Sequence, residues 1–295
     1  MERWTFRIVD VFTERPLEGN QLAVFGDASA IPEPLLQALA QEIGYSETVF
    51  AYPATDGGDA RIRIFTPANE VPFAGHPVLG TAVIVAANLG KDRVTLETGR
   101  GPVPVQIDRD SGRVTRGTME QPLPTIALYD NADAFLGALG AERSVLPVTI
   151  YDNGIPHVYA MLEHPEDVAA LKPDFSALAA LARDTGMPVV GFNVFSGSGN
   201  TWKTRMFAPA DNIAEDPATG SAAGPLALHL ARHGRIPWGT EIRIAQGAEI
   251  GRPSELFARV SGNGGQVERI EVSGCAVPVG GGWFDGDLLR GAGGV

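Results

Sequence analysis

The sequence has one cysteine, fewer basic than acidic residues and no long apolar run, and each shortage excludes a class of protein. The single cysteine, Cys275, excludes an internal disulfide and a cysteine-based metal cluster, and it is typical of a reducing compartment. The formal net charge of −12 argues against nucleic acid, whose binding needs a basic face. No apolar run approaches the ~20 residues of a membrane span, and the N-terminus has a strand pattern, not that of a signal peptide. We therefore expect a cytoplasmic protein with neither a membrane nor a nucleic acid as partner, and a buried, inert Cys275 thiol.

Several functional motifs are also missing. The glycine clusters at 197–200 and 280–282 do not form GxGxxG between a strand and a helix, so no dinucleotide fingerprint is present. Ser221 lacks a GxSxG context, which disfavours a serine nucleophile. His229 and His233 are spaced for one helix face but have no evident third ligand, so a solvated or capping pair is favoured over zinc. We expect no metal and no cofactor.

The length of 295 residues suits two domains of roughly 150 residues each. The 36 glycines and 22 prolines fall between short apolar runs, which indicates turns between strands. Prolines 122 and 124 interrupt the pattern, so we expect an N-terminal lobe over 1–122, possibly with 283–295, and a C-terminal lobe over 123–282. The glycine-rich end from residue 280 predicts a last strand and a loose tail.

The stretch from Arg61 to Val85 organises the chain because its pattern occurs twice. Residues 63–69 (RIFTPAN) recur 142 positions later as 205–211 (RMFAPAD), and residues 76–82 (HPVLGTA) recur 140 positions later as 216–222 (DPATGSA). Each copy reads as a strand, a loop and then a helix with proline at its first position. The repeat predicts two related halves, with His76 and Asp216 at equivalent helix starts.

These helix starts point to anion binding. A helix N-terminus presents unpaired N–H groups and about half a positive charge, so it accepts a carboxylate or phosphate. Gly80 and Gly220 let a ligand or another backbone approach. A pseudo-twofold pairing of the halves would direct both helix starts into one cleft. The alternative is that the two residues are only helix caps, although histidine, unlike aspartate, is not a preferred one.

A carboxyl group precedes the first repeat. Residues 45–51 read as a strand in which Glu47 shares a face with Val49 and Ala51, so a carboxylate lies at the mouth of an apolar strand. Partial desolvation of such a group raises its pKa towards the range useful for acid and base catalysis. A solvated glutamate at a strand edge is the alternative reading. The second half has only Gly191, Phe192 and Asn193 opposite this position, so we expect a chemically asymmetric site.

Five segments together resemble the PhzF family of phenazine-biosynthesis-type isomerases over nearly the whole chain. They are DVFTERPLEGNQLAVF, SETVF, FTPANEVPFAGHPVLGTA, EDPATGSAAGPLA and QGAEIGRPSEL. The resemblance implies an α/β (α+β) fold like that of diaminopimelate epimerase. In that fold two pseudo-symmetric lobes each wrap a mostly antiparallel, barrel-like sheet around a central helix, and the active site lies in the cleft between them.

The resemblance also implies a cofactor-independent isomerase. Its reaction would be a proton shift on a small cyclic or unsaturated carboxylate such as trans-2,3-dihydro-3-hydroxyanthranilate. Glu47 would be the proton shuttle, with His76 and Asp216 assisting it. The epimerases of this fold use a cysteine at each helix start, so a two-thiol mechanism is disfavoured in a chain with Cys275 alone.

Five further residues are predicted to bind the substrate, and they are Asn20, Ser46, Gly75, Gly220 and Ser221. The family's habit suggests a homodimer. Two alternatives stay open: an amino-acid racemase or epimerase that uses Glu47 with Asp216, and a non-catalytic protein that binds a small ligand. The sequence assigns no role to His157, His229, His233 or Cys275.

Overall fold

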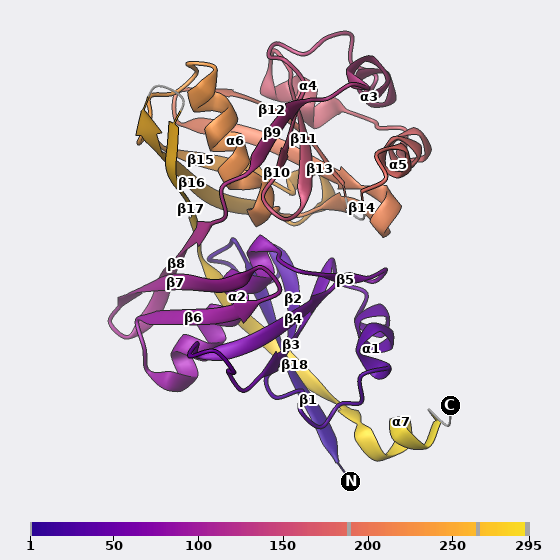
Figure 1. The fold of residues 1–295 in the computed structure, drawn as a ribbon, viewed down its shortest axis with the longest axis vertical. Helices are drawn as coiled ribbons and strands as arrows, with labels where there is room; N and C mark the ends of the chain where they lie inside the picture. The colour runs from indigo at the N-terminus through magenta and orange to yellow at the C-terminus, as the bar shows by residue number, and fades with distance from the viewer. Residues whose placement is uncertain (1, 188–189, 264–265, 293–295) are drawn as a thin grey trace. The chain divides into compact units, whose positions relative to one another are not determined.

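The computed structural model describes residues 2–187, 190–263 and 266–292. The chain divides into two compact units (Figure 1). Unit 1 comprises Met1–Met119 and Cys275–Val295, and unit 2 comprises Glu120–Gly274. Unit 1 therefore takes its last strand and last helix from the C-terminal end of the chain. Within the described residues, no helix is long and apolar enough to cross a membrane.

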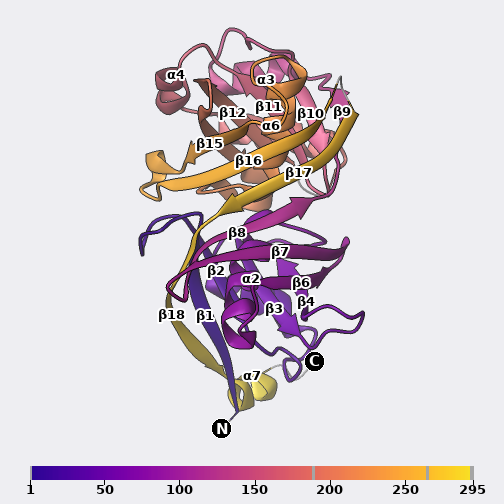
Figure 2. The same cartoon turned by 90° about the vertical axis from the view of Figure 1, so that its left-hand side faces the viewer.

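Unit 1 is a mostly antiparallel sheet with two helices against it and one at its end. Its strands are β1 Arg3–Val11, β2 Asn20–Phe25, β3 Glu47–Tyr52, β4 Ala60–Phe65, β5 Glu70–Val71, β6 Arg93–Thr98, β7 Gly101–Asp110, β8 Arg113–Gln121 and β18 Ala276–Asp285, and its helices are α1 Leu35–Ile43, α2 Gly75–Leu89 and α7 Gly286–Ala292. Neighbouring strands follow the order β18-β1-β2-β3-β4-β6-β7-β8, with β5 beside β4. Among these described pairings, β2/β3 and β4/β6 are the parallel ones. Figure 2 shows β1 and β18 side by side along their length.

Unit 2 repeats this order of pairings. Its strands are β9 Thr125–Leu128, β10 Thr149–Asp152, β11 Pro156–Met161, β12 Gly191–Ser198, β13 Thr201–Ala208, β14 Ile213–Asp216, β15 Glu241–Gln246, β16 Ser254–Asn263 and β17 Gln266–Gly274. Its helices are α3 Ala132–Leu139, α4 Pro165–Ala170, α5 Phe175–Asp184 and α6 Gly220–Arg232, with the 3-10 turns η1 Pro209–Asp211 and η2 Ala248–Ile250. The order is β9-β10-β11-β12-β13-β15-β16-β17 with β14 beside β13, and within the described part of this unit the parallel pairs are β11/β12 and β13/β15. The predicted fold class is confirmed, with each sheet open and not closed into a ring.

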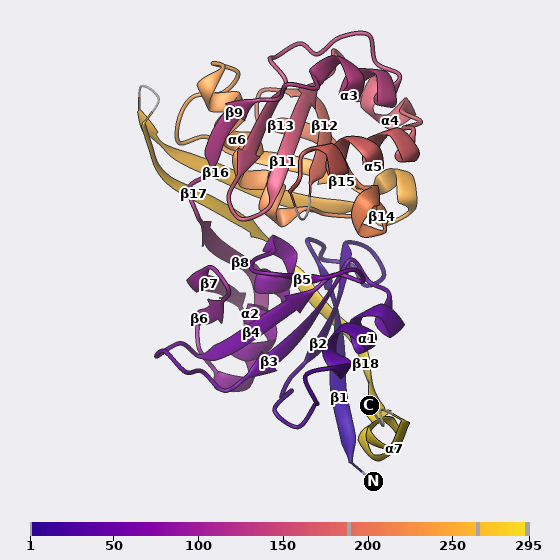
Figure 3. The ribbon, with the colours of Figure 1, turned by 45° about the vertical axis from the view of Figure 1, so that its right-hand side comes forward.

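One helix in each unit is buried almost all round, as a helix without a polar face must be. In α2 the residues from Gly75 to Ile84 are all buried, and in α6 the residues from Gly220 to Ala231 are. Side chains along the strands alternate between the two faces of the sheet. In β11, Val158 packs with the hydrophobic cluster under α3 and α5. The next residue, Tyr159, points the other way, and its hydroxyl donates to the Ala222 carbonyl of α6. Figure 3 shows α3, α4 and α5 gathered on one side of the unit 2 strands. In unit 2 the central helix α6 therefore packs on the opposite face of the sheet from α3 and α5.

The helix starts differ from the expectation. The helix α2 begins at Gly75 and α6 at Gly220, not at the prolines, and Asp216 is the last residue of β14, not a helix cap. In unit 2 the helix starts after Pro217 because strand pairing continues to Asp216. Val71 pairs with Ile64 in unit 1, and Asp216 pairs with Met206 in unit 2.

This register corrects the equivalence read from the repeat. Ile64 and Met206 match at the repeat offset of 142, so their partners Val71 and Asp216 match each other. The turn η1 lengthens the unit 2 loop, and the offset becomes 145. The residue that matches His76 is therefore Ser221, because each is the second residue of its helix.

Two other expectations were wrong. The C-terminal end forms the helix α7 after the last strand, where a loose tail was expected. Cys275 is half-buried, not buried, because it lies in the short link between β17 and β18, where its thiol donates to the Thr115 carbonyl.

Candidate active site

Three predicted polar side chains of unit 1 meet at one end of its sheet. The strands β2 and β3 are parallel neighbours that begin at the same end, so Asn20 and Glu47 are brought together there. The start of α2 adds His76. The His76 Nε2 atom lies 3.5 Å from Glu47 Oε2, and the Asn20 amide nitrogen lies 3.3 Å from His76 Nδ1. The side chain of His76 is 3% exposed and that of Glu47 is 12% exposed, so the pair is largely shielded from water.

The imidazole of His76 is neutral at physiological pH. Burial lowers its pKa to about 3, against the opposing effect of a backbone hydrogen bond with Gln21. A neutral ring carries one hydrogen on either nitrogen. With Nδ1 accepting from Asn20, Nε2–H faces the Glu47 carboxylate. A hydrogen on Nδ1, with Nε2 accepting from a protonated Glu47, would require the Asn20 amide to turn its oxygen towards the ring.

Two more predicted residues flank this cluster. Ser46 is half-buried and immediately precedes Glu47. Gly75 is the buried first residue of α2, whose N-cap Ala74 makes no side-chain hydrogen bond. The N-cap side chain therefore caps none of the backbone N–H groups of the first helical turn, and such groups can bind an anion.

In unit 2, Asp216 lies in a loop held by Gln246. The Thr219 hydroxyl donates to Asp216 Oδ2 at 2.7 Å. The Gln246 amide donates to the Asp216 carbonyl at 2.8 Å and accepts from the Thr219 backbone N–H at 3.1 Å. A Cβ at Gly247 would lie 2.5 Å from the Pro217 carbonyl oxygen, and its φ of +78° suits glycine. The segment QGAEIG, part of one of the five segments that carry the family resemblance, therefore holds the loop after Asp216 in place.

Gly220 and Ser221 open α6 beside a second buried cluster. His157 Nε2 lies 2.9 Å from Ser221 Oγ, and the Asn193 amide nitrogen lies 3.3 Å from His157 Nδ1. Burial lowers the pKa of His157 to about 3, so its ring is neutral. The Asn153 amide donates to the Ser221 carbonyl at 2.9 Å.

Sequence reasoning missed His157 and Asn193, although one signal was available. Gly191 occupies the place that Glu47 holds in unit 1, as Phe192 pairs with Phe207 just as Thr48 pairs with Phe65. A Cβ at Gly191 would lie 2.5 Å from His157 Nδ1. The glycine therefore makes room for the imidazole, and the predicted asymmetry consists of a carboxyl in unit 1 and a histidine in unit 2.

His229 is a core residue and not a solvated one. It is fully buried in α6, where its Nδ1 lies 3.0 Å from the Tyr151 hydroxyl and its ring stacks on Tyr159. Burial lowers its pKa to about 3. Among the described residues, no group of three or more His, Cys, Asp or Glu side chains could hold a metal ion.

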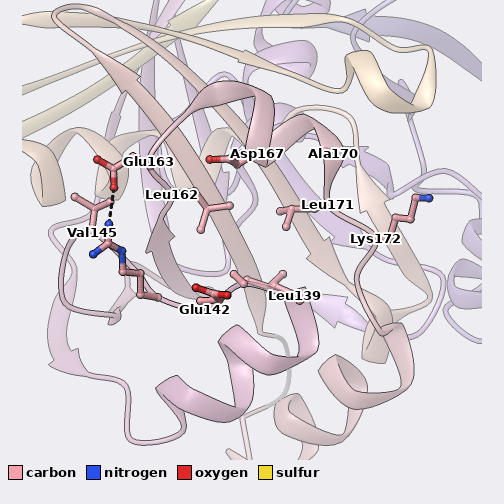
Figure 4. Close-up of a pocket in the computed structure, with 12 residues that line it drawn as sticks. Leu139, Glu142, Val145, Leu162, Glu163, Asp167, Ala170, Leu171 and Lys172 are labelled. Carbon is pink, nitrogen blue, oxygen red and sulfur yellow. Dashed lines mark hydrogen bonds and ion pairs between the residues drawn. The ribbon is translucent and has the colours of Figure 1, made fainter.

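A cavity of about 670 Å³ opens elsewhere in unit 2 (Figure 4). Its wall is formed by residues around the end of α3 and along α4, with the ion pair of Arg143 and Glu163 at one side. None of the predicted site residues lines it.

The fold and these clusters define a class of protein. Two α/β units of one topology, each with a central helix that starts beside buried polar groups, are typical of epimerase-like isomerases. The chain belongs to the phenazine biosynthesis-like protein family, PhzC-PhzF, whose profile matches residues 9–282.

Known proteins support this assignment. The chain is 47% identical to a trans-2,3-dihydro-3-hydroxyanthranilate isomerase of Pseudomonas aeruginosa, over 90% of this chain and 94% of that protein. A predicted epimerase of the same species has a solved structure that is 29% identical, with a TM-score of 0.81 over 96% of this chain and 99% of that one. A PhzF family protein of Bacillus anthracis, at 23% identity, shares the fold with a TM-score of 0.83 over 97% of this chain and all of that one.

Proposed function

We propose that this protein is an isomerase that shifts a proton on trans-2,3-dihydro-3-hydroxyanthranilate. The observation that carries the proposal is the shielded Glu47–His76 pair, with a neutral imidazole 3.5 Å from the carboxyl group. The activity of the relative that is 47% identical supports the choice of substrate.

In the proposed reaction Glu47 acts as base and then as acid. Its carboxylate takes a proton from one ring carbon, and the electron pair of that C–H bond enters the conjugated system. The protonated carboxyl then returns the proton to another carbon on the same face, so no proton is gained or lost overall. His76 stays neutral beside the carboxyl group, with Nε2 facing Glu47 and Asn20 on the other ring nitrogen.

Substrate-binding roles stay predictions for the other residues. Asn20, Ser46 and Gly75 in unit 1, and Gly220 and Ser221 in unit 2, are proposed to bind polar groups of the substrate, chiefly its carboxylate. Asp216 is proposed to assist by orienting the amine. Its hydrogen bond from Thr219 and the anchored loop support a fixed position for this carboxyl group.

A homodimer in the cytoplasm is proposed on the basis of the family resemblance and the single cysteine. Light scattering coupled to gel filtration tests the assembly state, and a mass of one chain would contradict the dimer.

Proton NMR of the substrate in D₂O tests the reaction. Wild-type protein is expected to convert the substrate to an isomer, with deuterium at the new C–H position in the turnovers in which the protonated Glu47 exchanges with D₂O before it returns the proton. Glu47→Gln is expected to lose turnover by at least ~100-fold, the range for loss of a general acid–base. Glu70→Gln is the control, because this carboxyl is 41% exposed and pairs with Arg63 away from His76.

The outcomes separate the alternatives. An unchanged substrate spectrum with wild-type protein would refute the substrate. Exchange of the α-proton in a panel of amino acids would favour a racemase instead, and binding of the substrate without exchange would favour a ligand-binding protein.

A further inference from the structure

We propose that His157 is a positioning residue that holds the Ser221 hydroxyl as a hydrogen-bond donor to an anionic oxygen of the ligand at the start of α6. The inference rests on the proposed function, because Ser221 is one of the residues assigned there to the substrate. It is carried by a chain of three buried side chains that runs from Asn193 through His157 to Ser221.

Asn193 fixes which atoms donate and which accept in this series of hydrogen bonds. Its side-chain nitrogen lies 3.2 Å from the Gly191 carbonyl oxygen and 3.3 Å from that of Val158. An amide oxygen in this place would face two other oxygens, so the group there must be the NH₂ donor. This NH₂ group also lies 3.3 Å from His157 Nδ1.

The tautomer of His157 follows. A ring nitrogen that faces an NH₂ group accepts a hydrogen bond and carries no hydrogen itself. The single hydrogen of the neutral ring is therefore on Nε2, from which it is donated to Ser221 Oγ at 2.9 Å. With its oxygen already accepting, Ser221 has its own hydrogen to donate.

The hydrogen bond between His157 and Ser221 runs in the opposite direction from that of a nucleophilic serine. In a hydrolase triad the histidine accepts the serine proton, and an acidic group holds the other ring nitrogen in its N–H form. Here the amide of Asn193 imposes the opposite tautomer, and burial opposes protonation of the ring. Ser221 is therefore suited to hold a carboxylate oxygen and not to attack a carbonyl.

The fold makes space for this arrangement. A side chain at Gly191 would collide with the ring of His157, and the Asn153 amide fixes the Ser221 backbone from the other side. His157 and Ser221 are 1% and 3% exposed, so the hydrogen bond between them is little weakened by water. No such histidine stands in unit 1, where the residue in register with Glu47 is Leu22 and the helix residue is His76.

Nitrogen-15 NMR of the histidine rings tests the tautomer without any ligand. The protein has five histidines, and a His157→Gln variant identifies the signals of His157 by their loss. We expect Nε2 to be the protonated nitrogen and Nδ1 the acceptor. A ring with its hydrogen on Nδ1, or with both nitrogens protonated at pH 7, would overturn the inference.

Substitutions test the consequence for binding, with dissociation constants for trans-2,3-dihydro-3-hydroxyanthranilate measured in the Glu47→Gln background so that turnover does not interfere. Ser221→Ala is expected to weaken binding roughly ten- to hundredfold, the size of a hydrogen bond to a charged group. His157→Phe is expected to weaken it by a smaller factor, and His157→Gln to restore most of it, because the glutamine amide places an N–H near the Nε2 position. In otherwise wild-type protein, KM should rise with little change in kcat.

Two results would count against the inference. One is a His157→Phe effect that is fully retained in the Ser221→Ala background, because this shows that the two residues act independently. The other is labelling of Ser221 by a fluorophosphonate probe, which requires a nucleophilic serine. Failure of the wild-type protein to bind or convert the substrate refutes the proposed function instead, and the NMR result stands separately from it.

Discussion

Ser221 holds in α6 the position that His76 holds in α2, as the second residue of a buried helix. Each contacts a side chain from the sheet of its own unit, Glu47 for His76 and His157 for Ser221. The two units thus use one backbone plan for different chemistry, with a carboxyl–imidazole pair in one and an imidazole–hydroxyl pair in the other.

The repeat supplies a matched pair of ion pairs. Arg205 contacts Glu215 through two nitrogens in unit 2, and Arg63 contacts Glu70 in the same way in unit 1. The first pair is 8% and 5% exposed and the second 21% and 41%. Because a lone buried charge is costly, Arg205→Met should lower the free energy of unfolding by about 3 to 5 kcal/mol. Arg63→Met should lower it by only about 1 kcal/mol. Urea denaturation compares them, and equal losses would contradict the role of burial.

Gly191 should tolerate no side chain. Gly191→Ala places its Cβ 2.5 Å from His157 Nδ1, so we expect a loss of about 1 to 3 kcal/mol in the free energy of unfolding and a displaced imidazole. Gly137→Ala in α3 is the control, because no atom lies within 4 Å of its Cβ position and alanine favours the helix by up to about 1 kcal/mol. Thermal melting measures both, and a Gly191→Ala protein as stable as wild type would show that the ring has room to move.

Gln246 should control substrate binding through the Asp216 loop. Gln246→Ala removes hydrogen bonds to the Asp216 carbonyl and to Thr219, so KM should rise and the free energy of unfolding should fall by about 1 to 3 kcal/mol. Gln37→Ala provides the comparison, because its amide also donates to two backbone carbonyls, those of Thr66 and Pro67, and all three residues belong to unit 1. Steady-state kinetics measures KM for both variants. Equal changes of KM would refute a specific role of Gln246 in substrate binding.

Buried histidines should make the protein acid-sensitive. His76, His157 and His229 each have a pKa lowered to about 3 by burial, against an ordinary value near 6.5. The contribution of these three neutral rings to the free energy of unfolding is fully present above pH ~6.5. It is lost as the pH falls towards ~3, because the unfolded chain binds protons that the folded chain does not. Each such group adds a slope of about 1.4 kcal/mol per pH unit. Urea unfolding at pH 7, 6 and 5 measures it, and His157→Gln should reduce the slope by about this amount. Stability that stays level over this range would contradict the neutral rings.

Much of the fold could be predicted because its signals are local. The alternation that puts Glu47 on the face of Val49 is set by the two-residue period of a strand. The duplicated motif of residues 63–69 and 205–211 marks the same strand in both units, β4 and β13, and the pairing order of the two sheets agrees with it. The approach of His76 to Glu47 was predicted through the family resemblance, and the structure places the two side chains together.

The sequence by itself determined the strand and helix periods and the existence of two related halves, and its family resemblance pointed to the residues proposed to carry the chemistry of unit 1. Only the tertiary structure decided that Ser221, and not Asp216, matches His76, because that equivalence depends on strand register and on the extra turn η1. It alone also brought His157 to Ser221, 64 residues away along the chain. Such contacts depend on which strands are neighbours and on the volume left free at a glycine, and neither property is encoded in any short stretch of sequence.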